Sequence, residues 1–130
     1  NSMALGGSVP FEWIPSTVVV FAMEENGLHG SALLEDLPTA LEDFDIFSNE
    51  LSGTLNLTKL PDGLCMFSAC TNTFSGSADL AQLPRTLQEI DLSDNCLSGT
   101  LDLTHLPNGL KCIFLSYNLF EVEVDFSQLP

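Results

Sequence analysis

Side chains that could carry out chemistry are sparse in this chain of 130 residues, and their spacing matches no catalytic motif. The chain contains His29 and His105, but no G-x-S-x-G, H-E-x-x-H, C-x-x-C or phosphate-binding glycine-rich loop. Its four thiols are those of Cys65, Cys70, Cys96 and Cys112. We therefore predict that the protein is not an enzyme, needs no cofactor and holds no metal ion.

The overall charge narrows the choice of partner. Asp and Glu number 18 against 3 Lys and Arg, which gives a formal net charge of −15. Because three basic residues cannot neutralise a phosphate backbone, we predict no nucleic-acid partner. The longest apolar run, 18–23, is far shorter than the ~20 residues of a transmembrane helix, so no membrane insertion is predicted. With 45% hydrophobic residues, the chain has enough apolar surface to fold.

A repeat of 23 residues organises the sequence. The pair Leu-Pro recurs every 23 residues from Leu37-Pro38 to Leu129-Pro130, and Ile14-Pro15 precedes it by one more step. We predict a single domain, 1–130, that begins with a partial repeat, 5–13, and stops two residues into a truncated sixth repeat, 129–130. The five full repeats are 14–36, 37–59, 60–82, 83–105 and 106–128.

Within a repeat, numbered from the Leu of Leu-Pro, apolar positions 8 and 10 alternate with mostly polar positions 7 and 9. This alternation predicts one half-buried strand per repeat. A second, shorter strand is predicted at positions 17–21, for example 99–103. Pro at position 2 disfavours helix, so extended chain or 3₁₀ turns and little α-helix are expected. Position 13 is always Asn, whose amide can donate and accept between stacked turns; this predicted structural ladder is Asn26, Asn49, Asn72, Asn95 and Asn118.

The pattern L-x-x-L-x-L-x-x-N-x-L resembles the leucine-rich-repeat family, and the 23-residue unit is similar to plant-type repeats and to those of protozoan surface proteins. The resemblance implies a β-rich solenoid, a right-handed coil with a parallel concave sheet and short convex strands or 3₁₀ turns. It also implies that the concave face is the ligand surface. We expect the column that contains Asn56, Asp79, Asp102 and Asp125 to cap turns on the opposite side.

The side chains at positions 7, 9, 11, 12 and 14 are expected on the concave face, where they include eight carboxylates and no Lys or Arg. The acids there could serve only to keep the sheet soluble. Alternatively, they surround exposed apolar anchors and bind a protein partner that carries basic residues. The candidate ligand-binding residues are Asp43, Asp45, Phe47, Met66, Glu89, Asp91, Asp94, Phe114 and Tyr117.

We predict a non-catalytic protein-interaction module. The alternatives are a structural or antigenic cell-surface array and a regulatory repeat segment of a larger protein. The uncovered last coil would also allow an end-to-end homodimer. No two cysteines are expected opposite each other on adjacent strands, and free thiols favour the cytoplasm. The family resemblance and the glycosylation triplet 56–58 allow the cell surface instead, so localisation stays open.

Overall fold

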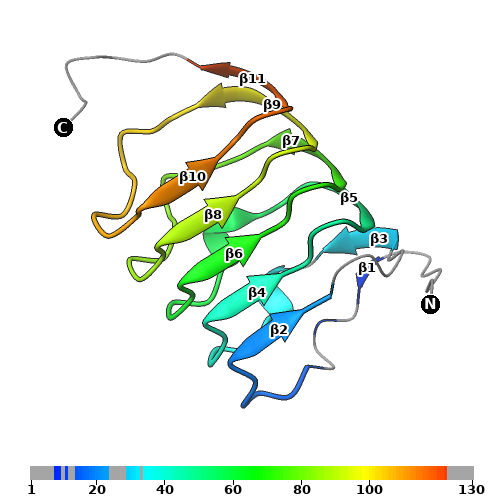
Figure 1. Ribbon diagram of the computed structural model, residues 1–130, viewed down its shortest axis with the longest axis vertical. Helices are drawn as coiled ribbons and strands as arrows, with labels where there is room; N and C mark the ends of the chain where they lie inside the picture. Colours follow the sequence, from blue (N-terminus) through cyan, green and yellow to red (C-terminus); the bar gives the residue numbers. More distant parts are fainter. Residues whose placement is uncertain (1–7, 10, 12–13, 24–28, 33, 123–130) are drawn as a thin grey trace.

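A computed structural model of the protein describes residues 8–9, 11, 14–23, 29–32 and 34–122. These residues coil into a β-solenoid of about four turns with two parallel sheets and no α-helix in the described ranges. Figure 1 shows the two sheets on opposite sides of the coil, with the strands of each stacked in chain order. The predicted solenoid is therefore confirmed. Three of the predicted repeats, 37–59, 60–82 and 83–105, lie wholly within the described residues.

The first sheet has five strands, one from each repeat. In chain order they are β2 (Val20–Ala22), β4 (Asp43–Asp45), β6 (Met66–Ser68), β8 (Glu89–Asp91) and β10 (Cys112–Phe114). Neighbouring strands pair residues 23 apart, so Phe44 lies beside Phe67 and Phe67 beside Ile90. Equivalent repeat positions therefore form rows across the sheet, with the side chains of positions 7 and 9 on its outer surface.

The second sheet has six strands: β1 (Ser8–Val9), β3 (His29–Ala32), β5 (Glu50–Gly53), β7 (Thr73–Ser77), β9 (Cys96–Leu101) and β11 (Leu119–Val122). Four of these strands, β5, β7, β9 and β11, begin at position 14 of their repeats, earlier than the predicted position 17. The reason lies just before them, where the position-12 residues adopt the left-handed conformation with φ of 57–58°. That conformation turns the chain sharply, so Asn at position 13 is followed directly by the second sheet.

The interior between the sheets is a continuous stack of apolar columns. In the middle turns, Leu41, Leu64 and Leu87 at position 5 and Phe44 at position 8 are fully buried. The ring of Phe44 stacks on Phe67 with centroids 5.7 Å apart. Phe11 meets Phe44 edge-on at 5.4 Å. These phenylalanines are core residues, and no turn could bury them without its neighbours.

The asparagine ladder is confirmed for the four predicted members within the described residues. Asn72 Nδ2 donates to the carbonyls of Ile46 in the preceding turn and of Ala69 in its own turn, at 3.0 and 3.1 Å. Its Oδ1 accepts from the backbone N–H of Leu51 at 3.1 Å. Asn49, Asn95 and Asn118 make equivalent carbonyl contacts. Asn26 lies outside the described residues.

The side of the coil away from the five-stranded sheet is closed by short turns. The 3₁₀ turns η2 (Leu34–Asp36) and η3 (Leu57–Lys59) occur in two repeats. The predicted capping column is also observed, because the Oδ1 atoms of Asn56, Asp79 and Asp102 each accept from the backbone N–H two residues later. Asp125 lies outside the described residues.

Candidate protein-binding face

The outer surface of the five-stranded sheet carries paired acids at its centre. Asp43 and Asp45 on β4 lie in register with Met66 and Ser68 on β6, and these lie in register with Glu89 and Asp91 on β8. We call these six residues the acidic face. Two strand spacings, about 9.6 Å, separate the backbones of the two acidic strands. Four carboxylates therefore surround a neutral central strand.

Two of these carboxylates are held by the backbone that follows them. Asp45 Oδ1 accepts from the Phe47 N–H at 3.1 Å, and Asp91 Oδ1 accepts from the Ser93 N–H at 3.0 Å. The Ser93 hydroxyl donates to the same Asp91 oxygen at 2.6 Å. These local hydrogen bonds fix the position-9 carboxylates in similar orientations on both sides of β6.

Partial burial and mutual repulsion both disfavour the charged form of Asp45 on the acidic face. Partial burial raises the pKa of Asp45 above its ordinary value of 3.8, and the nearby carboxylates of Asp43 and Asp91 raise it further. The hydrogen bond from the Phe47 N–H acts in the opposite direction. Since no Lys or Arg contributes to the acidic face, this repulsion has no compensating cation among the described residues of the face.

A shallow hollow of about 210 Å³ lies over the middle of the acidic face. All six residues of the face line it, together with Phe67 beneath. Met66 is 42% exposed at its centre and provides an apolar floor. The hollow thus combines an apolar base with acids on two opposite sides, an arrangement that suits a side chain with an apolar stem and a cationic head.

Not every predicted ligand-binding residue lies on this face. Phe47 follows β4 and is half-buried rather than exposed as expected. Asp94 and Tyr117 occupy the left-handed turn at position 12, so they lie at the rim of the sheet. Phe114 is 46% exposed on β10, one strand beyond Glu89 and Asp91. Position 14 belongs to the second sheet, which removes it from the predicted face.

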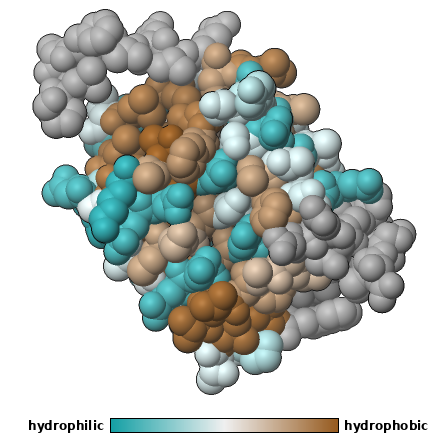
Figure 2. Space-filling view, in the orientation of Figure 1, coloured by the Kyte–Doolittle hydropathy of each residue, from teal (hydrophilic) through white to brown (hydrophobic). Residues whose placement is uncertain are grey.

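The apolar columns are less buried at both ends of the described coil than in its middle turns. Val18, Phe21, Leu110 and Ile113 are only partly buried, whereas their equivalents in the middle turns are fully covered. In Figure 2, hydrophobic side chains gather near both ends of the five-stranded sheet, with hydrophilic ones between them. A terminal repeat lacks a neighbour on one side, which is the reason the last coil was expected to be uncovered.

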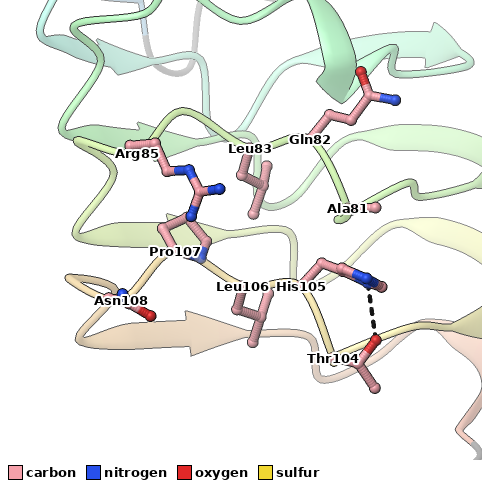
Figure 3. A pocket seen from close by; sticks show the side chains of 9 residues that line it. All are labelled: Ala81, Gln82, Leu83, Arg85, Thr104, His105, Leu106, Pro107 and Asn108. Carbon is pink, nitrogen blue, oxygen red and sulfur yellow. Dashed lines mark hydrogen bonds between the residues drawn. The ribbon is translucent and has the colours of Figure 1, made fainter.

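A larger hollow of about 490 Å³ lies away from the acidic face, between residues 81–85 at the junction of the third and fourth repeats and residues 104–108 at the junction of the fourth and fifth. Among the described residues that line it, Arg85 and His105 are the basic ones. Figure 3 shows the Arg85 guanidinium beside Pro107, while the His105 ring turns toward Thr104, with which its Nδ1 forms a 2.9 Å hydrogen bond. The Arg85 and His105 side chains do not converge, so this hollow offers no focused binding site.

The cysteines are free, as predicted, and none of the four forms a disulfide. Cys96 and Cys112 are exposed, whereas Cys65 and Cys70 are half-buried. Burial raises the pKa of the Cys70 thiol, and the Asp91 charge contributes to this increase. Cys70 therefore holds its proton more firmly than an ordinary thiol.

Within the part of the chain that the structure describes, no three His, Cys, Asp or Glu side chains are grouped so that they could hold a metal ion. The same residues include no helix long and apolar enough to cross a bilayer. No known protein family matches the sequence, and no curated protein is significantly similar to it.

Proposed function

We propose that this solenoid is a leucine-rich-repeat domain that acts as a non-catalytic protein-binding module, and that its acidic face receives Lys or Arg side chains of a partner protein. The observation that carries the proposal is the hollow between β4 and β8, where four carboxylates face an exposed apolar side chain.

The size of the attraction can be estimated from the strand geometry. A cation centred over β6 would lie about 6 Å from each of the four carboxylates, given strand spacings of about 4.8 Å and a rise of about 3.4 Å per residue. In water each pair contributes about 0.7 kcal/mol before salt screening, which roughly halves it at physiological ionic strength. The total is about 1–3 kcal/mol, enough to change affinity by roughly one to two orders of magnitude.

The alternative, that the acids only keep the sheet soluble, accounts less well for their arrangement. Solubility requires charge but no particular orientation, yet Asp45 and Asp91 are both fixed by backbone hydrogen bonds. Charges with a purely solubilising role would also be expected to avoid sites that raise their pKa, as happens at Asp45. An oriented set of partly desolvated acids is better suited to binding a cationic partner.

The test uses NMR titration with an end-blocked peptide in which Lys alternates with Pro, since this probe is basic and extended but cannot join a sheet. Binding should shift the amide signals of β4, β6 and β8. Removing the four charges should weaken binding by about tenfold or more. The variant carries Asp43→Asn, Asp45→Asn, Glu89→Gln and Asp91→Asn.

A matched control removes the same amount of charge away from the acidic face and should leave the affinity within about twofold of the wild type. Its substitutions are Glu35→Gln, Asp62→Asn, Asp79→Asn and Asp102→Asn, all at exposed positions. Equal weakening by the two variants would show that only net charge matters, and the proposal would then be wrong.

A further inference from the structure

Several backbone groups of the edge strand β10 have no partner among the residues that the structure describes. In the inner turns, the Gln88 carbonyl accepts from the N–H groups of Lys111 and Cys112 in the next turn. The Leu92 N–H likewise donates to the Phe114 carbonyl. The corresponding groups on the last strand are the Lys111 carbonyl and the N–H of Leu115, and no residue in the described ranges pairs with them. The Tyr117 N–H also has no partner among the described residues. One turn earlier, the equivalent N–H of Asp94 donates to the Ser116 carbonyl.

The apolar interior of the coil is also incompletely covered beside β10. A hollow of about 420 Å³ lies against this end of the coil, and Leu103, Leu106, Leu110 and Ile113 are among its lining residues. These four are only partly buried. Their equivalents one turn earlier, Leu80, Leu83, Leu87 and Ile90, are 0–6% exposed. A further strand beside β10 would satisfy the open backbone groups and cover the apolar columns together.

We propose that β10 binds an extended segment of the partner as an added strand, and that this segment alternates basic with apolar residues. The inference rests on the proposed function, because the charge of the acidic face is what selects a basic partner. In register with β10, residues opposite Ile113 and Leu115 would face the open interior and should be apolar. Residues opposite Cys112 and Phe114 would face the outer surface.

Those outward residues are the ones that should be Lys or Arg. The backbone of the added strand would lie about 9.6 Å from that of β8. A long cationic side chain on the added strand and the Glu89 side chain on β8 can together span this distance. The stem would cross the exposed Phe114 ring, which also offers a cation–π contact. The charge on the face is therefore complementary to this pattern and not to an acidic strand.

Lys111 determines which charge the partner segment can carry at one further position. It lines the same hollow immediately before β10. A basic residue directly opposite it would be repelled, so the partner residue at that position should be neutral or acidic. The expected segment therefore begins with a neutral or acidic residue and continues with alternating basic and apolar ones.

The experiment compares two end-blocked peptides of equal charge, each starting with Glu: one alternates Lys with Val, and the other alternates Lys with Pro. The Val peptide should bind more tightly by about tenfold, because only it can complete the strand hydrogen bonds. At saturation, NMR hydrogen exchange at the Leu115 and Tyr117 amides should slow by about tenfold or more, while the Val20 amide on the opposite edge is unaffected.

Edge-blocking variants give an independent readout. Leu115→Pro removes an outward N–H and should abolish the advantage of the Val peptide. Val20→Pro makes the same change at the β2 edge and should leave that advantage intact. The exchange measurement needs no substitution, so the inference can be tested even if Leu115→Pro fails to fold.

The outcomes separate this inference from the proposed function. If both peptides bind equally and depend on the acidic face, but the Leu115 and Tyr117 amides gain no protection, the added strand is wrong and the proposed function stands. If neither peptide binds, both are wrong. If those amides are already protected without peptide, either by a concentration-dependent homodimer or by another part of the chain, the proposed occupant of the edge is wrong.

Discussion

Replacing Asn72 by Ala should strongly destabilise the protein, and the structure indicates how much. Asn72 is 7% exposed, and its side-chain amide links two turns. Its removal leaves one buried group with no partner, the Leu51 N–H. The Ile46 and Ala69 carbonyls each keep another hydrogen-bond donor. Asn49 Nδ2 still donates to Ile46, and Asn95 Nδ2 still donates to Ala69.

The loss of stability in Asn72→Ala can be estimated from these lost hydrogen bonds. An orphaned buried N–H costs about 1–3 kcal/mol, and each of the two lost amide donors contributes about 0.5–1.5 kcal/mol. The expected loss is therefore about 2–6 kcal/mol, a large share of the roughly 5–15 kcal/mol that stabilises a typical domain. The measurement is urea unfolding followed by circular dichroism, with the slope against denaturant compared between variants.

Asn118→Ala is the matched comparison, because Asn118 occupies the same position in the last described turn but is only half-buried. Water can replace part of its hydrogen bonding, so we expect a smaller loss of about 1–3 kcal/mol. Asn72→Asp keeps an acceptor for the Leu51 N–H but sets a carboxylate against backbone carbonyls. Its destabilisation should therefore increase as the pH rises. A loss below about 0.5 kcal/mol for Asn72→Ala would refute the hydrogen-bond accounting.

Three further predictions follow from the structure. Because the pKa of Asp45 is raised above 3.8, the folded state binds more protons than the unfolded state just above that pH. Asp45→Asn should thus stabilise the protein at pH 7, and this gain should disappear below pH 3.8 in a pH series of unfolding curves. Gly76→Ala should cost about 1–3 kcal/mol, since φ is +83° and the new Cβ would lie 2.9 Å from a neighbouring side chain, whereas Gly63→Ala should cost nothing measurable in the same assay. Alkylation followed by mass spectrometry should label the exposed thiols before the half-buried ones, that is, Cys96 and Cys112 before Cys65 and Cys70.

The sequence predicted the solenoid because its period places chemically equivalent residues in register. Phe44, Phe67 and Ile90 lie 23 residues apart and are paired on neighbouring strands, as the repeat requires. Asn72 and Asn95 were predicted to form a ladder for the same reason, since only a stacked coil gives an invariant amide a function in every turn. Side-chain type and spacing were sufficient for this part of the fold.

The extent of the binding face was harder to predict. Alternation placed Asp43 and Asp45 correctly on the outer surface of their strand. It could not reveal that the position-12 residue adopts a left-handed conformation, because Ser48, Asp94 and Tyr117 share no residue type that demands it. The predicted face therefore extended past the turn onto what is the second sheet. Partial exposure of Ile113 at the end of the described coil depends on which turns have neighbours, and it agrees with the uncovered last coil expected from the repeat count.

The most direct test of the central claim, that the acidic face itself attracts a basic partner, is the salt dependence of binding. The dissociation constant of the Lys–Pro peptide would be measured by NMR between about 0.01 and 0.15 M salt, where the screening length falls from about 30 to 8 Å. Binding should weaken markedly with salt for the wild-type protein and for the control variant, and should change little for the variant that lacks the charges of Asp43, Asp45, Glu89 and Asp91. An equal salt dependence in all three proteins would show that the acidic face does not attract the peptide.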